Sequence, residues 1–508
     1  MKLYKSIWVV AALAGMAGTG CQKFIDVNKN PNLATTADPA LVFTNALNQT
    51  AYFAPRGGNL LGSYWSGYWG HSTSYTTGTP EKTYSFSNGD FTYWGDIFDN
   101  LNDYQLVINS ADAKKVSFLK GPAKIMKALR YQELVDLYGN VPYSEAFKGI
   151  ELFQPKYDKA QDVYDSLIVL LTGAIADLKA NALPASLGAN IFYIGGGKTS
   201  ADWIKFANTL KLRILMRQSL VTARQNFIKD EIQKILTEGS GFLTEGMDVA
   251  CQPGYAKTSG KLNPVYAYTG FDQNDASVQG RDLYRISKHL IDTLIASDDT
   301  VRLKYIADVA PGKRPANAPA FYQGLKEDYV GVEFGGEGDE YLAPKTSPIG
   351  PGLVVRGEGT KAQVVFTAAE SYFLQAEAAE RLGIAALGSS KALYEKGIRE
   401  SFRLLGAPAS AATELIGGSA DFDAAANKIE AILYQKWVAL ANFNGLEAWA
   451  EYRRNDYPAV PFSVNSGQIG KKPVRLYYPQ DEVATNGDVV KAQGTIDVYT
   501  SRLFWDVR

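Results

Sequence analysis

The sequence contains very few of the residues that form metal centres and nucleophilic triads. Only two cysteines and two histidines, His71 and His289, occur in the whole chain. Their spacing fits no zinc site, and neither histidine accompanies the nucleophile elbow of a serine triad or a plausible cysteine partner. We therefore expect a protein that is not an enzyme, with no catalytic residue, no metal and no other cofactor.

The chain also lacks an excess of charge and any long apolar segment beyond its first residues. Lysine and arginine total 52 against 53 aspartates and glutamates, which gives a net charge of −1. Because there is no basic field to hold phosphate backbones, nucleic acid is not an expected partner. No stretch after Cys21 approaches the about 20 apolar residues of a membrane-spanning helix, so we expect membrane contact through a lipid anchor only.

The N-terminus has the pattern of an export signal. Lys2 and Lys5 precede an apolar run over residues 7–14, and small residues follow up to Gly20. Cys21 comes directly after them, which predicts a lipoprotein signal peptide over residues 1–20 and acylation of the Cys21 thiol, for example by palmitate. An ordinary signal peptide followed by an unrelated cysteine is the alternative. If Cys21 is acylated, Cys251 has no partner and the exported chain has no internal disulfide.

Helical periodicity dominates the rest of the chain. Residues 21–40 are polar and contain several Asn and Pro, so they are predicted to form a lipidated tether ahead of one domain over residues 41–508. Pro122 is expected near the start of one helix and Gly139 at its end. Long helices joined by short loops predict a mainly α fold of paired helices. The apolar stripes cover residues 94–108, 125–137, 163–178, 203–214, 366–376, 394–405 and 429–440.

Two long stretches, residues 240–280 and 307–362, do not fit the helical pattern. They are rich in Gly, Pro, Asn and Tyr and show no sustained period. Loops of this length inside a compact protein are usually functional or disordered. Their aromatic residues, among them Tyr255, Phe271 and Tyr329, favour order. We therefore expect long irregular loops that could carry a ligand site.

Carboxylates are numerous, and a glycosidase needs only two of them placed across a cleft. Glu370 and Glu377 share one helix face, as do Glu447 and Glu451. Arginines follow each pair closely in sequence, so ion pairs are the simpler interpretation. Residues 333–340 are also rich in acidic side chains, but their spacing matches no EF-hand loop, and a flexible acidic loop is expected instead.

A cluster of aromatic residues follows the first helices. Trp65, Tyr68 and Trp69 lie in a segment rich in Gly, Ser and Thr, off the helical stripes. Aromatic rings beside small polar residues suit a sugar pocket, because the ring covers the C–H face of the sugar and the polar groups bind its hydroxyls. A hydrophobic plug that packs a long loop onto the body is the alternative. The predicted ligand contacts, drawn from this cluster and from the region that follows residue 265, are Trp65, Tyr68, Trp69, Tyr75, Tyr266, Tyr268, Asp272, Asn274 and Arg281.

Several motifs, in order over nearly the whole chain, resemble the SusD/RagB family of outer-membrane lipoproteins, specifically its SusD-like nutrient-binding branch. Each motif is weak alone, and the set is specific. The segments that carry the resemblance are residues 21–31 (CQKFIDVNKNP), 137–146 (LYGNVPYSEA), 203–213 (WIKFANTLKLR), 369–378 (AESYFLQAEA), 435–437 (QKW), 447–454 (EAWAEYRR), 457–458 (YP) and 475–479 (RLYYP).

The resemblance implies a mainly α fold of tetratricopeptide-like helix pairs whose irregular loops carry the ligand site. It implies a lipid-anchored protein on the outer membrane, facing the exterior. It also implies a partner, a TonB-dependent transporter barrel resembling SusC, to which the protein delivers an oligosaccharide or, in the RagB-like branch, a peptide. The matching motifs lie on helices and turns, so they identify no ligand residue.

Two other classes of protein remain open at the level of sequence. A surface glycoside hydrolase would release products from glycans. An assembly scaffold would hold partner peptides on its helix pairs, although the two long irregular stretches are unusual for a helical-repeat scaffold.

Overall fold

Helices form most of the computed structural model, which describes residues 37–76, 80–184, 192–195, 199–319, 321–467 and 470–508. The predicted class, a mainly α fold in one globular domain, is confirmed. The helices of the first half are α2 (Pro39–Phe53), α3 (Gly57–Trp65), α4 (Pro80–Thr83), α5 (Tyr93–Ser110), α6 (Lys120–Tyr138), α7 (Ala160–Ala180), α8 (Ser200–Arg217) and α9 (Gln225–Glu238). Those of the second half are α10 (Pro264–Thr269), α11 (Gln279–Leu283), α12 (Lys288–Ala296), α13 (Thr300–Ile306), α14 (Ala368–Leu382), α15 (Ser390–Leu405), α16 (Ala409–Ile416), α17 (Lys428–Leu440), α18 (Gly445–Asn455), α19 (Gln480–Thr485) and α20 (Gly487–Lys491).

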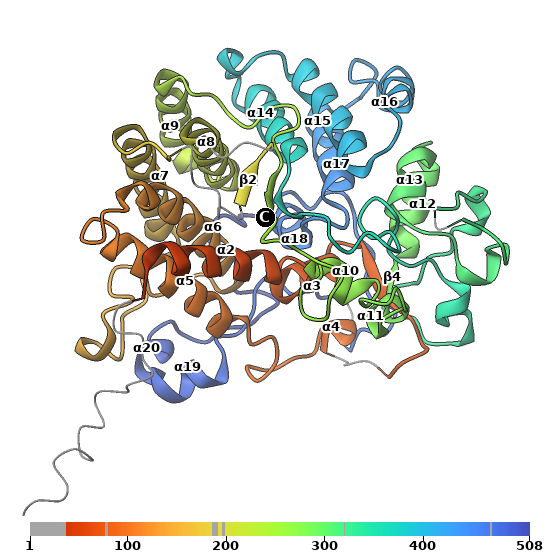
Figure 1. The fold of residues 1–508 in the computed structure, drawn as a ribbon, viewed down its shortest axis with the longest axis horizontal. Helices are drawn as coiled ribbons and strands as arrows, with labels where there is room; N and C mark the ends of the chain where they lie inside the picture. Colours follow the sequence, from red (N-terminus) through yellow and green to blue (C-terminus); the bar gives the residue numbers. More distant parts are fainter. Residues whose placement is uncertain (1–36, 77–79, 185–191, 196–198, 320, 468–469) are drawn as a thin grey trace, which may run out of the picture.

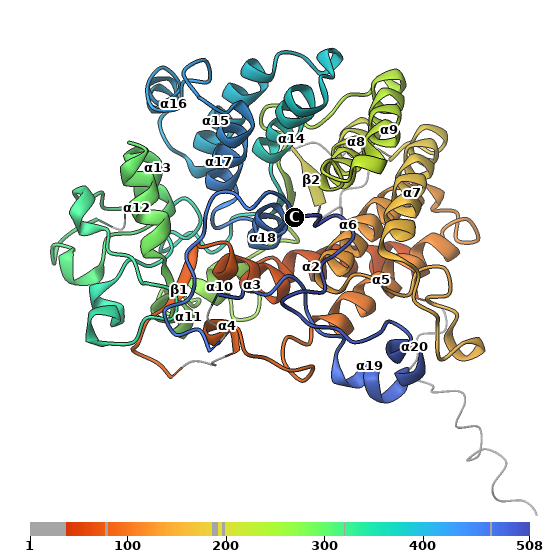
Figure 2. The ribbon, with the colours of Figure 1, turned by 180° about the vertical axis from the view of Figure 1, so that it is seen from behind.

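Consecutive helices pack against one another in tetratricopeptide-like pairs. Contacts link α5 to α6, α6 to α7 and α7 to α8, and a second series links α14 to α15 and α15 to α16 and α17. The two series lie side by side in an arc, with α12 and α13 at one end of it and α10 and α11 near α3 (Figure 1). Seen from behind, α18 lies near the centre of the molecule, between the two series and α3 (Figure 2).

Most of the predicted stripes correspond to helices. The stripes over residues 94–108, 125–137, 163–178, 203–214, 394–405 and 429–440 lie within α5, α6, α7, α8, α15 and α17. Gly139 follows α6 with a φ of 82°, a conformation that favours glycine, so the predicted helix end is confirmed. Phe366 was wrongly predicted to be helical: it ends a strand, and α14 starts only after Thr367, whose hydroxyl accepts a bond from the Glu370 N–H.

Two small antiparallel sheets connect segments that are distant in sequence. β1 (Trp69–His71) pairs with β4 (Tyr284–Ile286), in the register Trp69 to Ile286. β3 (Val249–Cys251) lies between β2 (Phe192–Ile194) and β5 (Gln363–Phe366). The first sheet fixes the segment after α3 beside the segment after α11. Apart from β3, helix α10, the first residues of α11 and short 3-10 turns, the stretches 240–280 and 307–362 are irregular, as predicted, where they are described.

The N-terminal predictions concern residues that mostly lie outside the described part. The signal peptide, Cys21 and the tether up to residue 36 are not described, and these predictions stay untested. The ordered chain begins with α2 at Pro39, capped by Asp38, whose carboxylate accepts the Ala40 N–H at 2.9 Å. Cys251 is buried and forms no disulfide with any described residue. Within the described helices, none has both the length and the hydropathy needed to cross a membrane.

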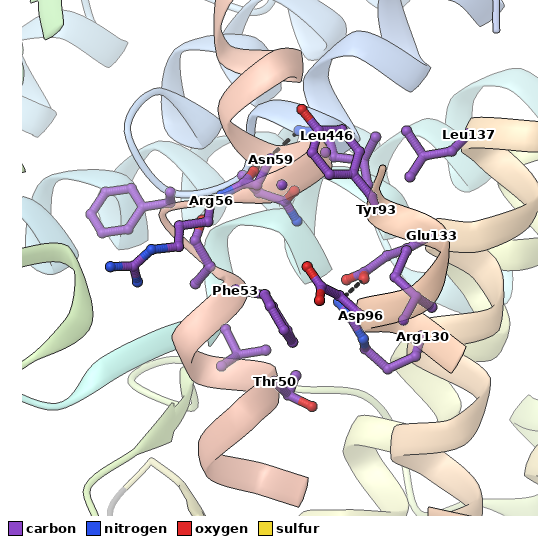
Figure 3. Close-up of a pocket in the computed structure, with 17 residues that line it drawn as sticks. Thr50, Phe53, Arg56, Asn59, Tyr93, Asp96, Arg130, Glu133, Leu137 and Leu446 are labelled. Atoms are coloured by element: carbon purple, nitrogen blue, oxygen red, sulfur yellow. Dashed lines mark hydrogen bonds and ion pairs between the residues drawn. The ribbon is translucent and has the colours of Figure 1, made fainter. Parts of the chain in front are cut away.

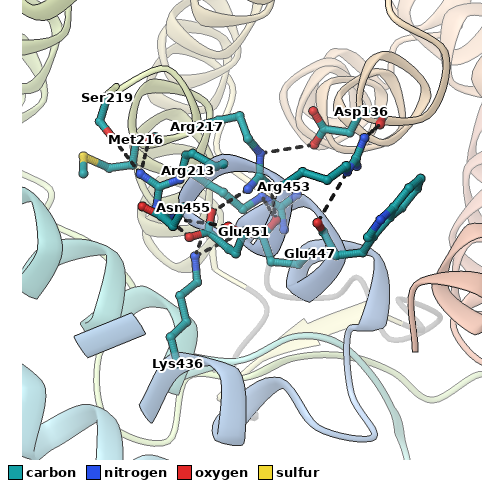
Figure 4. Close-up of polar contacts among 12 residues, drawn as sticks. Asp136, Arg213, Met216, Arg217, Ser219, Lys436, Glu447, Glu451, Arg453 and Asn455 are labelled. Carbon is teal, nitrogen blue, oxygen red and sulfur yellow. Dashed lines mark hydrogen bonds and ion pairs between the residues drawn. The ribbon is translucent and has the colours of Figure 1, made fainter. Parts of the chain in front are cut away.

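The paired glutamates noted in the sequence, Glu370 with Glu377 and Glu447 with Glu451, belong to a buried ion cluster. The cluster lies where α6, α8, α14, α17 and α18 meet (Figure 4). Arg217 of α8 binds Glu447 and Glu451 of α18 and lies 3.4 Å from Asp136 of α6. Arg454 donates to both carboxylate oxygens of Glu377 at 2.7 Å. These acidic groups are therefore structural, as the ion-pair interpretation predicted. The cluster consists of Asp136, Arg213, Arg217, Glu370, Glu377, Lys436, Glu447, Glu451 and Arg454.

Helix α3 crosses α18 at a contact between two glycines. A Cβ atom on Gly62 would lie 2.4 Å from the carbonyl oxygen of Gly445, and a Cβ on Gly445 would lie 2.3 Å from the Ser63 nitrogen. Neither helix could carry a larger residue here without moving apart. This close crossing places the C-terminal end of α3, and with it Trp65, against Trp449 of α18, with ring centroids 4.8 Å apart.

Candidate ligand-binding site

Three of the predicted ligand residues are core residues. The side chains of Trp65, Tyr68 and Trp69 are 3%, 0% and 3% exposed. Their polar atoms are also satisfied inside the protein: Trp65 Nε1–H donates to the Glu81 carbonyl, Tyr68 OH to the Trp437 carbonyl, and Trp69 Nε1–H to Asn442 Oδ1 at 2.8 Å. The structure therefore corrects the prediction for these three residues and favours the hydrophobic-plug alternative.

Tyr266 is also buried, at 3% exposure, which corrects a fourth assignment. Its hydroxyl donates to Asp275 Oδ1 at 2.8 Å and accepts the Gly357 N–H at 3.1 Å. The side chain thus connects the turn after α10 to the loop near residue 357. Its role is to hold the two irregular stretches together.

Tyr268, in contrast, belongs to a stack of rings that rises from the core to the surface. Tyr284 stacks on the buried Trp69, with centroids 5.9 Å apart, and Tyr268 stacks on Tyr284 at 5.5 Å. The Arg56 guanidinium lies 4.3 Å from the Tyr268 ring and 3.9 Å from the Tyr52 ring. Tyr52 is 43% exposed, so the series ends in an aromatic ring open to solvent. We call Trp69, Tyr284, Tyr268, Arg56 and Tyr52 the aromatic stack.

A close approach of two short helices links the aromatic stack to a neighbouring pocket. A Cβ atom on Gly280 of α11 would lie 1.8 Å from the Tyr268 carbonyl oxygen of α10, so only glycine fits at this contact. Tyr268 and Arg281 are consequently held next to each other on adjoining elements. Arg281 is one of the residues predicted to contact a ligand, and it lines a cavity in the irregular region.

This cavity has a volume of about 600 Å³ and lies where the two irregular stretches meet. Known ligand pockets have volumes of about 300–1,000 Å³, so its size suits one or two sugar rings. Phe271, Pro348 and Val354 supply apolar wall. We call it the arginine pocket, because its charged lining consists of Arg281, Arg285, Arg314 and Arg356 with Asp282 and Asp308.

The arginines differ in how the protein holds them. Arg281 donates to Asp308 Oδ2 at 2.6 Å and to the Ile349 carbonyl at 2.9 Å, and burial lowers its pKa below the ordinary value. Arg285 is fully buried and donates to the carbonyls of Asp282 and Thr346, and burial lowers its pKa to about 10. Even so, both remain cationic at neutral pH.

The remaining predicted residues lie around these two features. Asp272 Oδ1 accepts the N–H groups of Asn274 and Ala276 at 2.8 and 2.9 Å, so this carboxylate shapes the turn after α10. Asn274 is exposed on that turn. Tyr75 is half-buried in the segment after β1. The structure therefore brings Tyr268, Asp272, Asn274 and Arg281 into one region.

A second, smaller cavity lies beside Arg56 and is lined by residues of α2, α3, α5, α6 and α18 (Figure 3). Glu133 is bound there by Arg130, with Asp96 beside them, and these side chains face Phe53 across the space. The volume of about 60 Å³ is far below that of a sugar pocket.

Both histidines lie at least half-buried, and burial lowers the pKa of each. His71 is 6% exposed, and burial, with the charge of Lys82, lowers its pKa to about 3. Burial and Lys472 lower the pKa of His289 to about 4. No group of His, Cys, Asp and Glu side chains suited to a metal ion occurs in the described ranges.

Sequence reasoning missed most of the residues that form the two features. Arg314 and Arg356 lie in the stretch 307–362, which was predicted to be a ligand loop, but nothing in the pattern indicated that they converge on Arg281. Tyr52 and Arg56 lie at the end of α2 and just beyond it. Their spacing of four residues is a helical spacing, which was the available signal.

Comparison with known proteins identifies the family. Residues 31–479 match the SusD-like family described as "Starch-binding associating with outer membrane". A structure described as a chitin-binding protein is 26% identical, with a TM-score of 0.72 over 93% of this chain and all of that one. A chitin-binding SusD homologue from Flavobacterium johnsoniae is 23% identical, with a TM-score of 0.71 over 92% of this chain and 98% of its own.

A SusD-like protein from Bacteroides thetaiotaomicron is 23% identical and has a TM-score of 0.74 over 92% of this chain and 98% of its own. No match is found among curated protein sequences. The two relatives under 25% identity establish the fold, and the family match covers most of the sequence. The chain belongs to the SusD-like family.

Proposed function

We propose that this protein binds a nutrient oligosaccharide at the outer membrane and delivers it to a TonB-dependent transporter that resembles SusC. The observation that carries the proposal is the family match over residues 31–479. The 26% identical chitin-binding structure supports carbohydrate as the ligand class. An oligopeptide ligand is the alternative within the same family, and a surface hydrolase is the alternative outside it.

We place the sugar at the outer end of the aromatic stack. Tyr52 offers a ring to the apolar face of a sugar, and the Arg56 guanidinium beside it offers N–H donors to hydroxyl oxygens. The half-buried Tyr268 supports Arg56 from the other side. Tyr75, Asp272, Asn274 and Arg281 are the proposed further contacts along an oligomer.

Replacing Tyr52 by alanine is expected to weaken oligosaccharide binding about tenfold, the effect of losing roughly 1.4 kcal/mol of ring contact. The side chain is 43% exposed, so the melting temperature should change little. Leu41→Ala is the matched control, because Leu41 lies on the same helix and is 70% exposed. Titration calorimetry with a glycan that the wild type binds provides the measurement. Equal affinity of both variants and the wild type would remove Tyr52 from the site.

The membrane location and the partner can be examined together. We expect the wild-type protein, solubilised from its own membranes in mild detergent, to carry a fatty acyl group and to co-purify with an outer-membrane barrel. Cys21→Ser should abolish labelling by palmitate and leave the protein in the soluble fraction. Labelled Cys21→Ser protein would contradict the anchor, and lipidated wild type that never co-purifies with a barrel would contradict the transporter partner.

A further inference from the structure

The lining of the arginine pocket carries an excess of positive charge. It contains four arginines against two aspartates, an excess of two positive charges. Asp308 alone accepts from both Arg281 and Arg314, at 2.6 and 3.1 Å. Asp282 is the carboxylate nearest Arg285, at 3.4 Å. Neither aspartate forms a further ion pair with Arg356.

Arg356 has no evident structural role in the fold. It is exposed and forms no ion pair with any described residue. Its guanidinium group lies 4.9 Å from the centroid of the Phe271 ring. Glu358, two residues further on, pairs with Lys361 instead. Arg281 lies at the same distance, 4.9 Å, from the same ring, so Phe271 holds two guanidinium groups at the pocket.

The neighbouring groups leave this position with two guanidinium groups beside one ring. Two guanidinium groups that share one ring repel each other, and an anion between them would relieve that repulsion. Arg281 uses some of its N–H donors on Asp308 and the Ile349 carbonyl, and no described acceptor satisfies the others. The planar guanidinium matches a carboxylate or a sulfate ester through paired hydrogen bonds. Arg281 is half-buried, so salt screens its contacts less than those of the exposed Arg356.

We propose that the arginine pocket binds the acidic group of a sugar, so that the ligand is an oligosaccharide with a uronic acid or a sulfated residue. This inference rests on the proposed carbohydrate function and specifies its ligand class. The acidic sugar occupies the pocket at Arg356 and Arg281, and Phe271 contacts its apolar edge. Neighbouring sugars of the oligomer extend toward Tyr268 and the aromatic stack, because Gly280 holds α11 directly against α10.

The test uses an array of oligosaccharides and the soluble protein without residues 1–21. The array contains oligogalacturonates, oligomannuronates and sulfated and unsulfated chondroitin oligosaccharides, with neutral malto-, chito- and manno-oligosaccharides beside them. Each bound uronate is then compared, by titration calorimetry, with its carboxyl-reduced form, which keeps the linkage and removes the charge. The sulfated and unsulfated chondroitin pair separates a sulfate from a carboxylate as the recognised group.

Arg356→Gln is the critical variant, since no internal ion pair depends on Arg356. We expect it to weaken binding of the acidic glycan about tenfold, the loss expected for one charge-assisted contact. The affinity of the variant should not depend more steeply on salt concentration than that of the wild type. Arg356→Lys should lose less, because the positive charge remains. Arg399→Gln is the matched control, an exposed arginine on α15 that bonds to Thr413, and it should bind like the wild type.

The outcomes separate the two proposals. Acidic glycans that bind Arg356→Gln as tightly as the wild type, or no more tightly than their neutral counterparts, would overturn the inference. Binding of neutral glycans alone would overturn it too, while the carbohydrate function would stand. A protein that binds no glycan on the array would refute the carbohydrate function, and the acidic-sugar inference with it.

Discussion

Replacing Arg454 by methionine should reduce the free energy of unfolding by about 3–5 kcal/mol, the usual cost of removing one partner from a buried ion pair. Arg454 is 0% exposed and holds Glu377 through both guanidinium nitrogens at 2.7 Å. It also binds Glu451, Ser219 and the Met216 carbonyl. Without it, Arg381, at 2.8 Å, is the one ionic partner that the Glu377 carboxylate keeps among the described residues.

The loss should depend on pH in a defined direction. Burial alone would raise the pKa of Glu377, but Arg454 and Arg381 together lower it by more than burial raises it. The wild-type pKa of Glu377 therefore lies below the ordinary value. The wild type therefore gains stability from this group above its unfolded pKa and loses that stability as the pH falls. In Arg454→Met the pKa of Glu377 should rise, so protonation can remove the buried charge as the pH falls. The difference between the two proteins should thus be larger at pH 7.5 than at pH 5.

Urea unfolding at both pH values provides the measurement. Arg399→Met is the matched control, because it makes the same chemical change at an exposed position of α15. That control should differ from the wild type by no more than about 0.5 kcal/mol. If Arg454→Met is as stable as Arg399→Met, the buried ion cluster does not hold α8, α14 and α18 together.

Replacing Trp65 by alanine should destabilise the fold by about 3–5 kcal/mol and leave the affinity for oligosaccharide unchanged in the protein that remains folded. The ring is 3% exposed and packs edge-on against Trp449, with centroids 4.8 Å apart. It also contacts Tyr84, Phe86 and Phe91. Alanine would leave a cavity at the crossing of α3 and α18, where the glycine contact allows little collapse.

Tyr52→Ala gives the opposite pair of effects, weaker binding without much loss of stability, so the two variants check each other. Thermal unfolding and calorimetric titration are measured on both. A Trp65→Ala protein that melts like the wild type and binds glycan poorly would restore Trp65 to the ligand site. It would also contradict the packing of α3 on α18.

Helices were predictable because their signal is local. The stripe over residues 125–137 lies within α6, and Gly139 ends that helix with a left-handed φ that few other residues adopt. The strand that contains Phe366 was not predictable by the same reasoning, because its partner β3 lies more than a hundred residues earlier. A short strand without its pairing partner has little sequence signal.

The site was only partly predictable, for a related reason. Trp65 and Trp69 lie among small polar residues, and this composition suggested an open pocket. Their burial comes from Trp449 and Asn442, nearly four hundred residues later in the chain. Conversely, Arg281, which was predicted to contact a ligand, lines a cavity, whereas Arg356 reaches the same cavity only through the loop conformation. Sequence patterns locate the loops, and long-range contacts decide which side chains face a ligand.

The most direct test of carbohydrate binding is equilibrium titration of the soluble protein, without residues 1–21, against the glycans selected by array. We expect saturable binding of at least one oligosaccharide, retained in Leu41→Ala, weakened in Tyr52→Ala and unaccompanied by release of shorter products. Binding to no glycan, or steady cleavage of one, would contradict the proposed role as a binding protein that captures oligosaccharides.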